Sequence, residues 1–235
     1  NKTDFFREPE HFGCMEKTLL PALLAGRSES RPLLKIWSAA SSTGAEAYSI
    51  AMVLAQLMAQ RGDFRFAVLG TDISTDVLEV ARRAVFPLDQ VAPVPAQMQA
   101  RYLMQSRRAG LRPEVRIVPE LRRLVRFERL NLMEGRYPYD RDVDIIFLRN
   151  VLIYFDEATK VAVLGRLSGQ LASDGYLVLG AAETVTGHSN DFMGVPEGGH
   201  GIFRFTPEAA VRAAARDCAV PAAALAADGI APPTR

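Results

Sequence analysis

Cysteine and histidine are scarce in this 235-residue sequence, which contains two cysteines and three histidines. Cys14 and Cys218 stand far apart without metal-ligand spacing, so we expect reduced thiols rather than a disulfide. The histidines are scattered singly at positions 11, 188 and 200, which argues against a metal site. The composition therefore predicts a cytoplasmic protein that holds no metal ion.

Long apolar runs and a strong net charge are also absent. No run approaches the ~20 residues that a membrane-spanning helix needs, so we predict no membrane insertion. A formal net charge of +1 argues against a general nucleic-acid-binding protein. Apolar residues make up 49% of the chain, which is ordinary for a globular core. Because the chain begins at Asn1 rather than at a methionine, we expect it to be part of something longer.

Residues 33–58 predict a strand, a turn of small side chains and a helix. Apolar residues at positions 33, 34, 36 and 37 indicate a short buried strand. Small residues follow from Ser38 to Gly44, and the apolar spacing then changes to the 3.6-residue period of a helix. Small residues let a ligand approach the backbone, and a helix N-terminus offers unpaired N–H groups. Because Gly44 is the only glycine of this cradle, a nucleotide-like ligand fits better than a pyrophosphate.

Two carboxylates accompany the cradle, and each has a structural and a functional interpretation. Glu46 lies three residues after Thr43, which makes the pattern of a capping box. Glu46 could also hold a cationic ligand group, and the two roles are compatible. Asp72 ends a second predicted strand at 64–72, where nucleotide-binding α/β folds hold ribose hydroxyls. Asp72 could instead cap its own loop, but its place after the cradle favours the ribose role.

The first twelve residues combine three phenylalanines with one central arginine. Thr3 or Asp4 could cap a short helix, and a further helix is predicted from Met15 to Leu24. Arg7 carries a fixed charge and five donors, which suit the binding of a carboxylate. The simpler alternative is that the aromatic residues dock this segment while Arg7 makes a surface ion pair.

Residues 86–131 interrupt the alternation of strands and helices. Three prolines precede short alternating stretches, which predict a small antiparallel insertion at about 100–125 and a return strand from Val125 to Leu130. Between Arg101 and Arg129, nine arginines face three glutamates. A solvated face is the default explanation, although this local asymmetry also suits an acidic partner.

Residues 143–147 predict the cleanest buried strand, and polar residues follow its end. Arg149 and Asn150 come where a parallel sheet presents its ligand-facing edge, and Tyr154 lies four residues beyond Asn150. Asn150 and Tyr154 could equally be a turn residue and a core residue. Further strands are predicted at 175–180 and 200–205.

The order of these elements predicts an α/β fold. Strands that alternate with helices specify a mostly parallel, doubly wound, Rossmann-like sheet, here with the small antiparallel β insertion. The strand ends that carry Gly44, Asp72, Asn131 and Asn150 would meet at one edge. We assign residues 1–206 to this domain and residues 207–235 to an alanine- and proline-rich tail or linker that begins as a helix.

Six motifs occur in order from residue 1 to about residue 205: N-K-T-x-F-F-R, W-S-A-A-S-S-T-G-x-E-x-Y-S, T-D-I-S-x-x-V-L-x-x-A-R, N-L, F-L-R-N-V-L-I-Y-F-D and G-I-F-R-F. This series closely resembles the CheR-type chemoreceptor glutamate methyltransferases. The resemblance implies a Rossmann-like methyltransferase domain that moves a methyl group from S-adenosylmethionine to a receptor glutamate and leaves S-adenosylhomocysteine. The small helical domain that precedes the first motif in the family has no counterpart in this sequence.

The resemblance also implies a partner and particular site residues. The partner is the cytoplasmic domain of a chemoreceptor, and the insertion around Gly110 resembles a β-subdomain that binds a receptor-tail peptide in some members. Arg7 and Tyr154 are similar to residues that line the methyl-transfer site. Together with Gly44 of the cradle, the expected cofactor-binding residues are Asn1, Thr3, Arg7, Glu46, Asp72, Asn131, Leu132, Arg149 and Asn150.

Two other classes of function compete with this interpretation. A non-catalytic binding module could retain the fold, but intact Asn1, Arg7, Asp72 and Asn150 argue against a retired site. Methyltransferases that act on nucleic-acid amino groups often carry an Asn/Asp-Pro-Pro-aromatic loop after the fourth strand, whereas the sequence here is R-N-V-L. A glutamate acceptor needs no strong general base, because its reference pKa of ~4.3 leaves it ionised at neutral pH.

Overall fold

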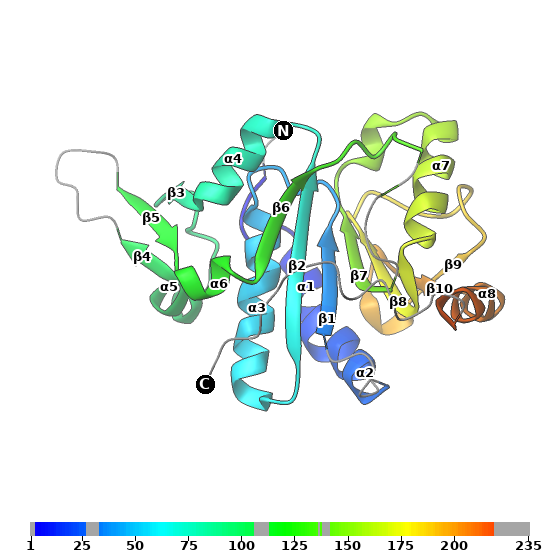
Figure 1. The fold of residues 1–235 in the computed structure, drawn as a ribbon, viewed down its shortest axis with the longest axis horizontal. Helices are drawn as coiled ribbons and strands as arrows, with labels where there is room; N and C mark the ends of the chain where they lie inside the picture. The colour runs from blue at the N-terminus through cyan, green and yellow to red at the C-terminus, as the bar shows by residue number, and fades with distance from the viewer. Residues whose placement is uncertain (1–2, 27–32, 106–112, 136, 138–141, 219–235) are drawn as a thin grey trace.

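The computed structural model describes residues 3–26, 33–105, 113–135, 137 and 142–218. A seven-stranded sheet forms its centre, and a separate three-stranded antiparallel sheet lies beside it (Figure 1). The prediction of an α/β fold with a mostly parallel sheet and a small antiparallel insertion is confirmed. Among the described residues, no helix has both the length and the apolar character to cross a membrane.

The central sheet has the strand order β6-β2-β1-β7-β8-β10-β9. The first five of these strands pair in parallel, β10 is antiparallel to β8, and β9 is antiparallel to β10. Strand order reverses between β1 and β7, which makes their carboxyl ends the expected place for a ligand. The strands are β1 (Leu33–Ser38), β2 (Arg65–Asp72), β6 (Val125–Arg129), β7 (Val143–Leu148), β8 (Leu171–Leu179), β9 (Phe192–Gly194) and β10 (Ile202–Phe205).

Two hydrophobic cores lie on opposite faces of this sheet. Alternate residues of β7 enter different cores, with Ile145 and Phe147 in one and Ile146 and Leu148 in the other. A parallel strand that is buried on both faces has a continuous apolar sequence, which is why this strand was predicted so readily. The helices that contribute side chains to the first core are α1 (Pro9–Cys14), α2 (Leu20–Ala25), α3 (Ala45–Arg61) and α4 (Thr75–Arg83). Those that contribute to the second are α7 (Glu157–Ser168) and α8 (Pro207–Cys218).

The N-terminal segment differs from its prediction. Neither Thr3 nor Asp4 caps a helix, because the first helix begins at Pro9 with Glu8 as its N-cap residue. Proline suits the first turn of a helix, since its fixed φ is helical and its missing N–H would have no partner there. The predicted helix over 15–24 is thus part of a longer one, which includes a π-helical turn at Met15–Leu19 and ends at Ala25.

The antiparallel sheet has the order β3-β5-β4 and takes its first strand from the proline-rich stretch that the sequence left unassigned. Its strands are β3 (Val85–Pro87), β4 (Leu103–Gln105) and β5 (Glu114–Ile117). Two short helices, α5 (Ala96–Tyr102) and α6 (Pro119–Arg122), flank it. Gly110, around which the receptor-tail site was expected, lies outside the described residues.

Residues 207–218 form α8, which packs against β8 and buries Ala209 and Ala213. The remainder of the alanine- and proline-rich stretch lies outside the described residues. The domain boundary at residue 206 stays a prediction.

Gly44 provides a test of how tightly the cradle packs. Its φ is 87°, and a Cβ there would lie 2.9 Å from both Ala81 Cβ and a Phe127 ring carbon. Gly62 also has a positive φ, 71°, but a Cβ there would have no neighbour within 4 Å. We expect Gly44→Ala to lower the free energy of unfolding by about 2–4 kcal/mol, because backbone strain and overpacking add. Gly62→Ala should cost only about 1 kcal/mol.

Urea denaturation of the parent and both variants measures these losses. Equal losses would contradict the packing argument, because the two glycines share the positive φ and differ in their neighbours.

Candidate functional site

A cavity of about 650 Å³ lies at the carboxyl ends of the parallel strands, beside the reversal of strand order. Its walls come from the N-terminal segment, the loop after β1, the end of β2, and the segments that follow β6 and β7. This volume lies within the range of about 300–1,000 Å³ that is typical of small-molecule sites. Asp72, Asn131 and Asn150, which were predicted from three separate strand ends, therefore meet in one place.

Most of the predicted site residues line this cavity. Gly44 does not line it but packs against Ala81 and Phe127, and Asn1 lies outside the described residues. Their binding roles, like those of the lining residues, stay predictions. The predicted residues in the lining are Thr3, Arg7, Glu46, Asp72, Asn131, Leu132, Arg149, Asn150 and Tyr154.

The loop after β1 forms a wall of small side chains, which include Ala39, Ala40 and Ser42. Backbone hydrogen bonds attach it to both neighbouring strands: Ala39 N–H donates to Phe147 O at 2.8 Å, and Ser41 N–H donates to Thr71 O at 2.8 Å. The loop is thus held between β7 and β2, and it lets a ligand approach the backbone closely.

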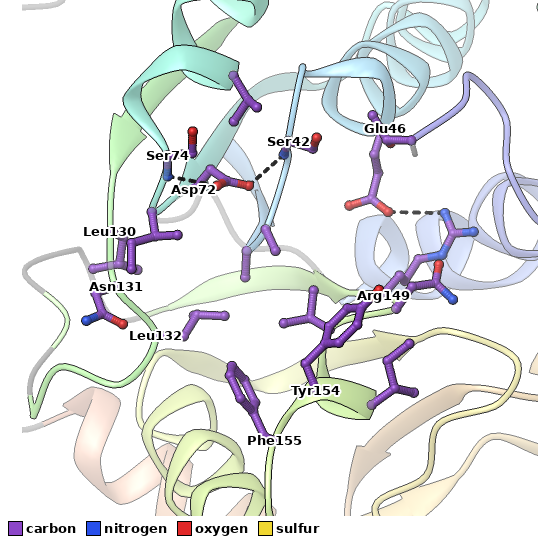
Figure 2. Close-up of a pocket in the computed structure, with 18 of the residues that line it drawn as sticks. Ser42, Glu46, Asp72, Ser74, Leu130, Asn131, Leu132, Arg149, Tyr154 and Phe155 are labelled. Atoms are coloured by element: carbon purple, nitrogen blue, oxygen red, sulfur yellow. Dashed lines mark hydrogen bonds and ion pairs between the residues drawn. The ribbon is translucent and has the colours of Figure 1, made fainter. Parts of the chain in front are cut away.

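Asp72 braces this loop as well as facing the cavity. Its Oδ2 accepts from Ser42 N–H at 2.9 Å, and its Oδ1 accepts from Ser74 N–H at 3.0 Å (Figure 2). Asp72 therefore caps its own loop, as the structural interpretation predicted. Each carboxylate oxygen can accept a further hydrogen bond, so the contacts leave room for a ribose.

Glu46 does not form the capping box that its spacing from Thr43 indicated. The N-cap residue of α3 is Gly44 in the left-handed region, and no side chain caps this helix. Glu46 Oε1 instead accepts from Ser38 Oγ at 2.6 Å, and its Oε2 lies 3.2 Å from Arg149 Nη1. The capping prediction is wrong because the tight turn at Gly44 starts the helix one residue later.

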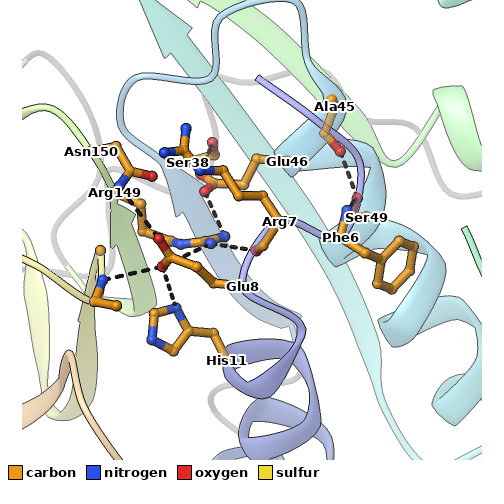
Figure 3. Close-up of polar contacts among 12 residues, drawn as sticks. Phe6, Arg7, Glu8, His11, Ser38, Ala45, Glu46, Ser49, Arg149 and Asn150 are labelled. Carbon is orange, nitrogen blue, oxygen red and sulfur yellow. Dashed lines mark hydrogen bonds and ion pairs between the residues drawn. The ribbon is translucent and has the colours of Figure 1, made fainter. Parts of the chain in front are cut away.

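Arg149 is the charged centre of the site, and its side chain is only 2% exposed. Its guanidinium lies between two carboxylates, with Nη2 3.1 Å from Glu8 Oε2 and Nη1 3.2 Å from Glu46 Oε2 (Figure 3). Nη2 also donates to the carbonyl of Arg7, and the guanidinium lies over the Phe12 ring, 5.6 Å from its centroid. Within the described residues its buried Nε has no hydrogen-bond partner.

Glu8 was not predicted as a site residue, although it joins the N-terminal segment to the end of β7. Burial raises the pKa of Glu8, but the charge of Arg149 and hydrogen bonds from Arg149, Asn150 and Ala181 outweigh it, so the pKa is lowered from 4.5. His11 Nδ1 lies 3.4 Å from the same carboxylate. No sequence signal identified Glu8, because its hydrogen-bond partners come 141 to 173 residues later.

The two sides of the cavity differ in chemistry. Figure 2 shows Asp72 on one side and the pair of Glu46 and Arg149 on the other. Apolar side chains line the cavity as well, and Tyr154 stands at the mouth with 66% of its surface exposed. The apolar lining includes Ile73, Val77, Leu130, Leu132, Met133, Val151, Ile153 and Phe155. The arrangement can take a ligand that carries hydroxyls, an apolar ring and charged groups.

This fold and this cavity define an α/β domain that binds a nucleoside-containing cofactor. Residues 1–198 match the family described as CheR methyltransferase, SAM binding domain. The chain belongs to that family, and its cofactor is S-adenosylmethionine. The resemblance that the six motifs indicated is thereby confirmed.

Relatives from three bacteria cover most of this chain. The chemotaxis protein methyltransferase of Borreliella burgdorferi is 39% identical over 194 residues, which are 81% of this chain and 66% of that protein. A probable chemotaxis protein methyltransferase of Rhizobium etli is 37% identical, over 83% of this chain and 73% of that protein. Chemotaxis protein methyltransferase 2 of Pseudomonas aeruginosa is 38% identical, over 78% and 63%. The chain thus spans about two thirds of their length.

The interaction between Glu8 and Arg149 predicts a pH-dependent effect on stability. Because the folded-state pKa of Glu8 is lowered, its contribution is fully present above 4.5 and is lost as pH falls through the folded-state value. We expect Glu8→Gln to be less stable than the parent by about 1–3 kcal/mol at pH 7. This difference should shrink below pH 4.5 and vanish once Glu8 is protonated in the folded protein.

Urea unfolding between pH 3 and pH 7 measures the difference, with the exposed Glu10→Gln as the control. A deficit that stays constant across this range would contradict the assignment, since it would not depend on the charge of Glu8.

Proposed function

We propose that this protein transfers a methyl group from S-adenosylmethionine to glutamate side chains in the cytoplasmic domains of chemoreceptors. The product is a glutamyl methyl ester, and the reaction takes place in the cytoplasm. The observation that carries the proposal is the convergence of Arg7, Asp72, Arg149, Asn150 and Tyr154 on one cavity in a chain of the CheR family. The names of the relatives, all chemotaxis protein methyltransferases, support the same activity.

The cavity supplies partners of the right chemistry for each part of the cofactor. Asp72 would accept from the ribose hydroxyls, while the apolar lining would surround the adenine ring. Glu46 would hold the ammonium group, and the positive charge of the Arg149 guanidinium would attract the carboxylate. Asn131 and Asn150 would supply further amide contacts at the strand ends.

Bound S-adenosylmethionine supplies a methyl group on a positively charged sulfur atom. The acceptor carboxylate is already nucleophilic, so the protein must align the two groups and exclude water. Arg7 is exposed at the cavity mouth, where it would orient the substrate carboxylate or neutralise the carboxylate of the cofactor. Tyr154 would cover the acceptor at the same mouth. No side chain needs to remove a proton.

The antiparallel sheet would provide the receptor-docking surface. Strand β4 lies at the edge of this sheet, and an extended peptide can add to an exposed edge through backbone hydrogen bonds. Arg101, Arg116 and Arg123 are exposed on or next to the sheet, which suits an acidic receptor tail. Docking there would raise the concentration of receptor glutamates near the cavity.

Calorimetric titration with S-adenosylhomocysteine tests the ribose role of Asp72. We expect the parent to bind and Asp72→Ala to bind at least about 30-fold more weakly, because hydrogen bonds to a charged group are lost. The matched control is Asp76→Ala, an exposed acid in the first turn of α4 that does not line the cavity. Equal affinities of the parent and a folded Asp72→Ala variant would exclude the ribose role.

Methyl transfer to a receptor cytoplasmic fragment tests Arg7, with the ester measured as alkali-labile methanol. We expect Arg7→Ala to lower the rate about 100-fold while unfolding changes by less than about 1 kcal/mol, because the charge acts on the reacting groups. Arg83→Ala serves as the control, since Arg83 is 77% exposed and lies on α4 away from the cavity lining. An unchanged rate in Arg7→Ala would refute its role.

A further inference from the structure

Glu183 is a buried carboxylate outside the proposed cofactor contacts, and only 8% of it is exposed. It follows β8 and accepts hydrogen bonds from four backbone N–H groups. Its Oε2 accepts from Asn150 and Gly180, and its Oε1 accepts from Val151, each at 2.8 Å. Ile153 N–H adds a longer contact of 3.4 Å to Oε1. Three of these four amides belong to the segment after β7.

That segment forms the cavity wall at the acceptor end. Asn150 and Tyr154 both line the cavity, and the amides that Glu183 holds lie at and between these positions. Asn150 has a φ of 58°, in the left-handed region that residues other than glycine seldom adopt. Such a conformation persists only where the surroundings enforce it. Here the Glu183 carboxylate enforces it, because it accepts hydrogen bonds from the N–H groups of both Asn150 and Val151.

Gly180 completes this arrangement by leaving room for it. A Cβ at Gly180 would lie 2.7 Å from Asn150 Nδ2 and 2.9 Å from Glu183 Oε2. A side chain at this position would therefore displace the carboxylate, the Asn150 side chain, or both. The contact to Asn150 Nδ2 is significant because that amide also reaches Glu8 Oε1 at 3.4 Å.

We propose that Glu183 is a positioning residue, which holds the backbone of residues 150–153 so that Asn150 and Tyr154 face the cofactor and the acceptor. The inference rests on the proposed function for what these two side chains do. We call the Glu183 carboxylate and the backbone N–H groups of residues 150, 151, 153 and 180 that it accepts from the clamp. The clamp is a property of the protein without cofactor. It therefore can be tested separately from methyl transfer.

Two variants disturb the clamp from different sides. Glu183→Gln keeps the shape of the side chain but turns one acceptor into a donor that faces backbone N–H groups. Gly180→Ala keeps the carboxylate but displaces it, because the added Cβ would lie 2.9 Å from Glu183 Oε2. The matched controls are Glu79→Gln, on the exposed face of α4, and Gly165→Ala, where a Cβ would have no neighbour within 4 Å.

Amide hydrogen exchange of the cofactor-free protein measures the clamp directly. We expect the amides of residues 150, 151 and 153 to exchange at least about tenfold faster in both clamp variants, because their acceptor is lost or displaced. The amides of β1 should stay protected in these variants, and both controls should match the parent. Unchanged exchange of the three amides in Glu183→Gln would overturn the inference.

Calorimetry with S-adenosylhomocysteine then measures positioning. We expect Kd to rise about tenfold in both clamp variants at unchanged stoichiometry. A merely structural role would instead lower the free energy of unfolding and leave Kd unaltered in variants that remain folded, and that result would overturn the positioning role. A parent that fails to bind would refute the proposed function, and hydrogen exchange would then decide the clamp alone.

Discussion

The pairing of the buried Arg149 guanidinium with Glu8 and Glu46 is the interaction on which the rest of the site depends. A guanidinium that is removed from water must be paired, and removing one partner of a buried pair typically costs about 3–5 kcal/mol. Its carboxylate partners come from two elements, with Glu8 in the N-terminal segment and Glu46 in α3. The same guanidinium donates a hydrogen bond to the Arg7 carbonyl. One buried cation therefore fixes the path of the N-terminal segment across the cavity.

Carboxylates also hold the backbone of two cavity loops. Asp72 accepts from Ser42 N–H in the loop after β1, and Glu183 accepts from Asn150 N–H after β7. Ser42 and Asn150 both have positive φ values, 49° and 58°. In each loop a carboxylate thus stabilises backbone that would otherwise relax. Such rigidity suits a reaction that needs alignment of two groups more than it needs acid–base chemistry.

The fold and much of the lining could be predicted because parallel strands have a simple sequence pattern. Strands buried on both faces appear as short apolar runs, and the residues after such runs occupy the ligand-binding edge. This rule located Asp72 at the end of β2 and both Arg149 and Asn150 after β7. Helix starts were harder, because Gly44 and Pro9 begin their helices through backbone conformation, which outweighed the capping pattern around Thr43.

The sequence by itself determined the α/β class, the order of the strands along the chain and the polar residues at their ends. Tertiary structure alone decided the partners of the buried charged groups. Glu8 meets Arg149 across 141 residues, and Glu183 meets Asn150 across 33. Periodicity and local spacing describe contacts within one element. These two contacts form because the packing of the fold removes Arg149 and Glu183 from water, so each needs a polar partner from a distant segment.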